Sequence, residues 1–275
     1  YYGGMPKLNL KNPEVEKYIT DVACYWIKEC DIDGWRLDVG DEISHFFWKN
    51  FRKAVKAVKK DMLIIGEIWH YAGDFLEGDE WDTVMNYPFY LNLIDLLADE
   101  KITVSQFVQN LGYLKGRLHK NCYPLMWNLI DSHDTARFLH LCNDNKKKQH
   151  LAAAFQLLLP GMPMIYYGDE YAMPGANDPD CRRGMYWDEE YQDKEMYEWY
   201  KRLIQVRKSH ACIVEGELAG SVTEDAEGTV VLIRKNGEET IAMIFNCSSS
   251  AKKFNEYTQK YNLLTENTFD GNVEG

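Results

Sequence analysis

Residues 62–67 read Met62-Leu63-Ile64-Ile65-Gly66-Glu67, an apolar run that ends at a glycine and a carboxylate. Such a run predicts a β-strand buried on both faces, as in a parallel sheet covered by helices. A second short strand is predicted at residues 34–38, and an amphipathic helix at about 44–59 lies between the two. This strand–helix–strand order is the unit from which α/β domains with parallel strands are built.

The same alternation continues on both sides of this unit. Upstream, Asn12-Pro13 predicts a helix start, with the asparagine as N-cap and the proline in the first turn. The apolar stripe expected on that helix consists of Val15, Tyr18, Ile19, Val22, Trp26 and Ile27. Downstream, the pattern predicts helices near 90–98, 104–118, 150–159 and 194–208, and strands near 82–85, 124–130 and 164–167.

Two architectures can hold five parallel strands: an open doubly wound sheet, or part of a (β/α)8 barrel. A doubly wound nucleotide site normally has a glycine-rich turn after its first strand. No such turn is present, since Gly3-Gly4 precedes no predicted helix. The sequence therefore favours the barrel, in which catalytic groups lie at the C-terminal ends of different strands.

The predicted pattern changes after Ser209, from alternating strands and helices to short strands. Residues 230–234 and 240–245 predict short strands, and Asn236-Gly237 between them is typical of a hairpin turn. We therefore predict two domains, residues 1–210 as the catalytic barrel portion and residues 211–275 as a small antiparallel β-sandwich domain.

Composition narrows the classes of function. The 275 residues carry 31 basic and 43 acidic side chains, a net charge of -12, and aromatic residues make up 13%. This balance argues against nucleic acid and against an anionic membrane as partners, because both are bound by clustered Lys and Arg. No apolar run approaches the roughly 20 residues of a membrane span.

The seven cysteines are an odd number without a CxxC pair, so neither a disulfide scaffold nor a structural zinc site is expected. Reduced thiols favour a cytoplasmic protein, while secretion remains an alternative. The acidic residues at 178–180 and 188–190 lack the alternating ligands of a calcium loop, so we expect no metal.

Three acidic residues follow predicted strand ends: Asp38, Glu67 and Asp134. Their intervals of 29 and 67 residues are close to one and two strand–helix units, which would bring all three to the mouth of one barrel. Taken singly, each is better explained as a helix cap or a turn residue, and their shared position after strand ends is what favours a site.

The local sequences around these acids are more specific than their spacing. They resemble three signature segments of the α-amylase family of glycoside hydrolases: Gly34-Trp35-Arg36-Leu37-Asp38, Gly66-Glu67-Ile68-Trp69-His70 and Ser132-His133-Asp134-Thr135-Ala136-Arg137. Met5-Pro6-Lys7-Leu8-Asn9 resembles the marker of the neopullulanase and cyclomaltodextrinase branch, and residues 161–170 resemble the family's last barrel strand and loop.

The resemblance implies roles for individual residues. Asp38 would be the nucleophile, Glu67 the general acid/base, and Asp134 the third carboxylate, which holds and distorts the sugar. Arg36 alternates to the same strand face as Asp38 and would pair with it. His133 would bind sugar hydroxyls beside Asp134.

Four further residues are expected around the sugar. Asp178 and Arg182 match the family's Asp-Pro-x-x-Arg arrangement, which binds the next sugar outward. His45 and Trp69 are candidates for lining the pocket, with a packing role as the alternative for each.

The family resemblance also implies what is missing. A barrel has eight strands, whereas about five are predicted here, and the family's segment near the third strand does not occur in this sequence. We therefore expect the C-terminal part of a larger enzyme, about strands 4–8 of the barrel. Such a piece would need the missing N-terminal part of the same enzyme or would self-associate as a homo-oligomer, and alone it would have little or no hydrolytic activity.

The sequence thus predicts a retaining α-glucan hydrolase without a cofactor. It would cut α-1,4 linkages in maltooligosaccharides, cyclodextrins or pullulan, with the carboxyls of Asp38 and Glu67 about 5–5.5 Å apart. A transglycosylase on the same scaffold is the first alternative, because only the acceptor differs. A non-catalytic, amylase-like carbohydrate-binding protein is the second.

Overall fold

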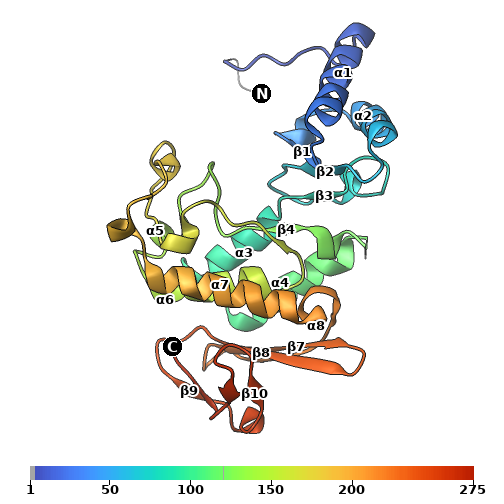
Figure 1. Ribbon diagram of the computed structural model, residues 1–275. Helices are drawn as coiled ribbons and strands as arrows, with labels where there is room; N and C mark the ends of the chain where they lie inside the picture. Colours follow the sequence, from blue (N-terminus) through green and yellow to red (C-terminus); the bar gives the residue numbers. More distant parts are fainter. Residues whose placement is uncertain (1–3, 120) are drawn as a thin grey trace. The chain divides into compact units, whose positions relative to one another are not determined.

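The computed structural model describes residues 4–119 and 121–275 and divides the chain into two compact units (Figure 1). The first unit runs to Met85 and the second from Asn86 to Gly275, and each is described by itself. The predicted domain boundary near residue 210 stays a prediction.

The first unit contains a parallel three-stranded sheet and two helices. The strands are β1 (Gly34–Leu37), β2 (Leu63–Gly66) and β3 (Thr83–Val84), in that order across the sheet, and the helices are α1 (Pro13–Cys30) and α2 (His45–Val58). In the register of β1 and β2, Gly34 lies opposite Leu63 and Leu37 opposite Gly66. Parallel strands and the helix between them confirm the predicted unit.

Both helix starts follow from their caps. The Asn12 side chain accepts a hydrogen bond from the backbone N–H of Glu14, with Pro13 in the first turn, as predicted. Ser44 caps α2 by accepting from the backbone N–H of Phe47.

The predicted apolar stripe of α1 is only partly buried. Ala23 and Ile27 are buried, whereas Tyr18, Val22 and Trp26 are exposed. Helix α1 packs against α2, and only part of the stripe is covered.

The second unit places helices against two kinds of sheet. Its helices are α3 (Tyr87–Leu97), α4 (Val104–Arg117), α5 (Phe138–Leu141), α6 (Lys146–Leu158), α7 (Lys194–Ser209) and α8 (Ala211–Glu215). A parallel pair consists of β4 (Trp127–Asn128) and β5 (Met162–Pro163), and an antiparallel sheet of β6 (Glu217–Glu224), β7 (Thr229–Asn236) and β8 (Glu239–Asn246). Two further antiparallel pairs follow, β9 (Lys252–Lys253) with β12 (Asn272–Val273) and β10 (Tyr261–Asn262) with β11 (Asn267–Thr268).

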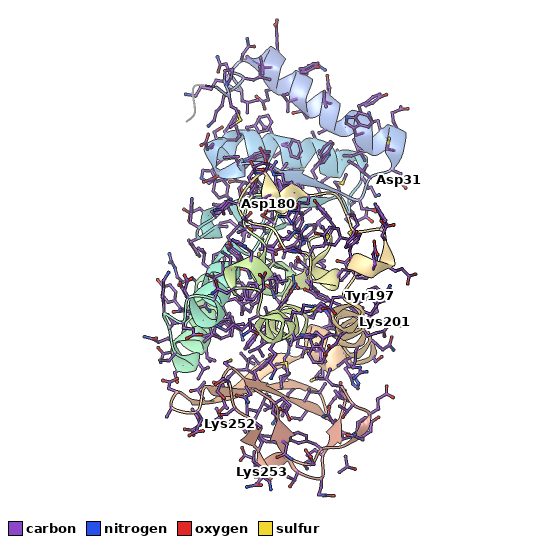
Figure 2. All side chains as sticks on the ribbon, turned by 90° about the vertical axis from the view of Figure 1, so that its left-hand side faces the viewer. Asp31, Asp180, Tyr197, Lys201, Lys252 and Lys253 are labelled. Atoms are coloured by element: carbon purple, nitrogen blue, oxygen red, sulfur yellow. The ribbon has the colours of Figure 1, made fainter. Side chains whose placement is uncertain are left out.

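One hydrophobic core joins the helices to the antiparallel sheet. Phe155 of α6 stacks on Phe245 of β8 with ring centroids 4.1 Å apart and meets Phe107 of α4 at 5.0 Å. Figures 1 and 2 show β9, which carries Lys252 and Lys253, on the side of the sheet away from these helices. The predicted hairpin forms, with Asn236 opposite Glu239 and Gly237 at a φ of 59° in the turn.

The largest differences between the predicted elements and the structure concern two strands and one helix. The strand expected at 124–130 is reduced to Trp127–Asn128, because residues 123–125 form a 3-10 turn. The strand expected at 164–167 lies instead at Met162–Pro163, because Met162 and Pro163 pair with β4 while Tyr166 and Tyr167 turn toward Arg137. Helix α6 begins at Lys146, four residues before the predicted start, where the Asn145 side chain caps it.

All seven cysteines lie in the described residues and are free thiols. Within the described ranges, no helix is both long and apolar enough to cross a membrane.

Candidate functional site

The first unit brings Arg36, Asp38 and Glu67 together at the ends of β1 and β2. Arg36 Nη2 lies 2.8 Å from Glu67 Oε1, and Arg36 Nη1 pairs with Asp38 Oδ1. Arg36 and Asp38 share a face of the chain because they are two residues apart. One guanidinium therefore contacts both carboxylates that were predicted to carry the chemistry.

The two carboxylates differ in exposure. The Asp38 side chain is 74% exposed, whereas that of Glu67 is 4% exposed. Asp38 therefore faces a region where a ligand can reach it, and Glu67 is held in place by protein donors.

Glu67 is fixed through both its side chain and its backbone. The backbone N–H of Val39 donates to Glu67 Oε2 at 2.9 Å, and Trp69 Nε1 donates to Oε1 at 3.4 Å. The backbone N–H of Gly40 donates to the Glu67 carbonyl oxygen at 3.1 Å. Trp69 thus touches a predicted catalytic side chain while remaining 43% exposed.

The turn after β1 contains a strained residue that sequence reasoning missed. Val39 has a φ of 44°, a left-handed conformation that is costly for a β-branched side chain. This conformation aims its N–H at Glu67. Residue propensities gave no signal for it, because valine favours extended backbone.

Trp81 packs under the ends of β1 and β2, and its ring leaves no room for a side chain at Gly40 or Gly66. A Cβ on Gly66 would lie 2.2 Å from the Trp81 ring, and one on Gly40 would lie 2.7 Å from it. Trp48 Nε1 also donates to the Gly40 carbonyl oxygen at 2.8 Å. The backbone that carries Asp38 and Glu67 therefore rests directly on an indole face.

Among the residues that the structure describes, His45 contacts Glu80 rather than the carboxylates of Asp38 and Glu67. Its Nδ1 lies 2.9 Å from Glu80, whose side chain is 2% exposed, and its ring stacks on Phe75 with centroids 4.4 Å apart. Burial raises the pKa of Glu80, and the hydrogen bond from His45 opposes that shift. This geometry favours the packing alternative for His45.

The second unit brings together the other four predicted residues: His133, Asp134, Asp178 and Arg182. Arg182 Nη2 donates to Asp134 Oδ1 at 3.1 Å, and Arg182 Nε lies 2.8 Å from Asp178 Oδ1. Arg182 Nε also donates to the His133 carbonyl oxygen at 2.8 Å, and His133 Nε2 lies 3.2 Å from Asp134 Oδ2. The convergence of Asp134 with Asp38 and Glu67 stays a prediction, because they belong to different units.

A buried ionic group supports the segment that carries Asp134. Arg137, Asp131 and Asp169 are each at most 1% exposed, and Arg137 Nη1 lies 3.2 Å from Asp169 Oδ1. Asp131 Oδ2 accepts from the backbone N–H of Phe138 at 2.8 Å. Arg137 and Asp169 lie in motif segments, but neither received a role from the sequence because burial is not visible there.

The same group is linked to the loop that carries Asp178 and Arg182. The Arg137 guanidinium lies over the rings of Tyr166 and Tyr167, at 4.4 and 4.9 Å from their centroids. Tyr166 OH donates to the Cys181 carbonyl oxygen at 3.3 Å, and Tyr167 OH donates to that of Arg183 at 2.6 Å. Within the residues that the structure describes, no cluster of three or more His, Cys, Asp or Glu is placed to hold a metal ion.

The chain is similar in sequence to known proteins. Residues 1–192 match the family described as alpha amylase, catalytic domain. The chain is 46% identical over 247 residues to a cyclomaltodextrinase of Geobacillus thermopakistaniensis, covering 90% of this chain and 42% of that protein. It is 42% identical over 242 residues to neopullulanase 2 of Thermoactinomyces vulgaris, covering 88% of this chain and 41% of the relative.

The chain is also similar to a solved structure. A cyclomaltodextrinase superposes with a TM-score of 0.89 at 38% identity, over 92% of this chain and 44% of that one. The chain therefore spans less than half the length of these relatives.

Proposed function

The chain belongs to the alpha-amylase family, and we propose that it carries the catalytic residues of a retaining glycoside hydrolase acting on α-1,4-glucosidic bonds. Its fold is that of the alpha-amylase catalytic domain, a TIM-barrel family. The finer description, strands 4–8 of the barrel followed by a β-sandwich domain at 211–275, is part of the proposal.

The observation that carries the proposal is the contact of Arg36 with both Asp38 and Glu67. Retaining glycosidases use two carboxyl groups about 5–5.5 Å apart, one as nucleophile and one as acid/base. Two carboxylates on one guanidinium fit that spacing, and the exposed one suits attack on a sugar. Asp38 is therefore assigned as nucleophile and Glu67 as acid/base.

The reaction then proceeds in two balanced steps. An Asp38 oxygen bonds to the anomeric carbon while the glycosidic C–O bond breaks and Glu67 gives its proton to the departing oxygen. Water next attacks the same carbon, Glu67 takes a proton from that water, and the Asp38–sugar ester bond breaks. Two inversions leave the anomeric configuration unchanged.

The substrate is proposed to be an α-glucan: maltooligosaccharides, cyclodextrins or pullulan. The names of the relatives, cyclomaltodextrinase and neopullulanase, support this class. Asp134, His133, Asp178 and Arg182 are proposed to bind the sugar hydroxyls, since their polar atoms lie within hydrogen-bonding distance of one another and 30–54% of each side chain is exposed. Transfer to a sugar acceptor instead of water is the second candidate, because the same residues would catalyse it.

The whole protein's partners are proposals as well. We propose that this chain works with further residues of a longer enzyme and that alone it has little or no hydrolytic activity. Homo-oligomerisation and a cytoplasmic location remain proposals, the latter supported by the seven free thiols.

The test uses Glu67→Gln and Asp38→Asn in the longest natural reading frame that contains this sequence. Glu67→Gln should lower kcat on maltoheptaose by about 10²–10⁴-fold. The loss should be much smaller for bond cleavage in α-glucosyl fluoride, because fluoride leaves without protonation. Asp38→Asn should abolish turnover of both substrates.

NMR of the first product formed should show the α-anomer. Full activity of either variant on maltoheptaose would remove that residue from the mechanism. Initial formation of the β-anomer would overturn retention.

A further inference from the structure

A shallow hollow lined by aromatic residues lies on the loop after Arg182. It has a volume of about 320 Å³ and is lined by Met185, Tyr186, Trp187, Asp188 and Tyr191. The Trp187 side chain is 81% exposed and Tyr191 is 60% exposed. Large aromatic side chains gathered at the surface mark an interaction site more often than scattered ones do.

The loop that carries this hollow is held in place. Arg183 pairs with Asp180, which is labelled in Figure 2 on the short helix Asp180–Arg182, at 2.7 Å. The Arg183 carbonyl accepts from Tyr167 OH at 2.6 Å, and Gln192 Nε2 donates to the Tyr186 carbonyl at 2.7 Å. A hollow on a braced loop loses little conformational entropy when a ligand binds.

The rings of the hollow offer flat faces at an angle to each other. The Tyr186 and Tyr191 centroids are 5.8 Å apart, with planes inclined by 51°. Tyrosine and tryptophan combine an apolar face with a polar edge. A pyranose ring needs both, because its C–H face is apolar and its hydroxyl rim is polar.

The position of the hollow favours an extension of the sugar site. Trp187 follows Arg182 by five residues on the same loop, and Arg182 already joins Asp134 to Asp178. We propose that Tyr186, Trp187 and Tyr191 form a stacking platform for the outer glucose residues of a maltooligosaccharide chain. This inference rests on the proposed function and extends it to a preference for long substrates.

Charge argues against the other occupants. Asp188 lines the hollow, Glu189 and Glu190 follow it in sequence, and the chain has a net charge of -12. A second copy of this chain would bring like charge to that edge, which disfavours association. A neutral sugar meets no such repulsion and can hydrogen-bond to the carboxylates.

The test measures binding of maltoheptaose and maltose by isothermal titration calorimetry to the longest natural reading frame that contains this sequence. Each protein, including the otherwise unchanged chain, carries Glu67→Gln so that the sugar is not cut. Maltose is too short to reach from the inner sugars to the platform, so its binding should not depend on Trp187. Trp187→Ala should weaken maltoheptaose binding about tenfold, in line with the loss of one aromatic stacking contact. Trp187→Phe should retain most of the affinity, and Tyr191→Ala should repeat the loss. Trp26→Ala, which removes a 46% exposed tryptophan from α1, is the matched control and should leave binding unchanged.

Each other outcome overturns the platform. These outcomes are equal binding by Trp187→Ala and the unchanged chain, no maltoheptaose binding by the unchanged chain, and a Trp187-dependent dimer in sedimentation. The proposed function is judged separately, by turnover of the Asp38 and Glu67 variants. Loss of binding in Trp187→Ala together with full turnover by the Asp38 and Glu67 variants would leave a sugar site without the proposed chemistry.

Discussion

The buried group of Asp131, Arg137 and Asp169 predicts an unusual dependence of stability on pH. One guanidinium faces two carboxyl groups, and all three side chains are at most 1% exposed. Among the described residues, no hydrogen-bond donor meets Asp131 Oδ1 or Asp169 Oδ2. A proton on one of the two carboxyls supplies the missing donor and removes the excess negative charge.

Burial raises the pKa of Asp131 from 3.8 to about 6, against the opposing effects of the Phe138 N–H, Asp169 and Arg137. Burial also raises the pKa of Asp169 well above its ordinary value, and the neighbouring Asp131 adds to that. Between about pH 4 and pH 6 the folded state therefore binds more protons than the unfolded state, so stability falls as pH rises. A pKa difference of about 2 corresponds to about 3 kcal/mol of unfolding free energy.

The perturbation is Asp131→Asn. Asparagine keeps an oxygen for the Phe138 N–H and places an amide donor near Asp169, without a charge to bury. Relative to the unchanged protein, its free energy of unfolding should increase from pH 4 to about pH 7 by up to about 3 kcal/mol. Arg137→Met should have the opposite effect, a loss of about 3–5 kcal/mol, because it leaves buried carboxyls without a cation.

Urea denaturation followed by far-UV circular dichroism at pH 4.5, 5.5, 6.5 and 7.5 measures these differences. Asp169→Asn serves as the second variant, since it removes the other acid of the pair. Its free energy of unfolding should depend less on pH over the same range. A difference between Asp131→Asn and the unchanged protein that stays constant from pH 4.5 to 7.5 would refute the shared proton.

Two further predictions concern stability. Gly66→Ala should destabilise the protein by about 1–3 kcal/mol, because its Cβ would lie 2.2 Å from Trp81, whereas Gly112→Ala, in α4 with nothing within 4 Å, should stabilise it by about 0.5–1 kcal/mol. Equal melting temperatures of these two variants in thermal denaturation would contradict the packing of Trp81. Asn12→Ala should cost about 1 kcal/mol by removing the N-cap of α1, and unchanged hydrogen exchange of the first turn of α1 would speak against this.

Much of the first unit was predictable because its signals are local. The run at 62–66 is apolar on both strand faces, and Ser44 and Asn12 are side chains that cap helices in isolation as well as in proteins. The exposure of Tyr18 and Trp26 was not predictable, since periodicity identifies an apolar stripe but not what packs against it.

The displaced strand at 162–163 shows a different limit. Ile165, Tyr166 and Tyr167 have the residue types of a strand, but Tyr166 and Tyr167 stack on Arg137 and donate to a distant loop. These two aromatic side chains contact a cation in the structure, whereas a propensity pattern predicts a strand from them. The buried acids were missed for a related reason, because the arginine that pairs with Asp169 is 32 residues away in sequence and the burial of Asp131 comes from the fold.

The candidate site was predictable where its geometry depends on residues that are close together in the sequence. Leu37 lies opposite Gly66 in the sheet, so Asp38 and Glu67 each follow a paired residue by one position. Arg36 precedes Asp38 by two, which places its guanidinium on the same side and within reach of both carboxylates. In the second unit, Arg182 organises Asp134 and Asp178 in the same way. Each unit thus holds its own acids with its own arginine.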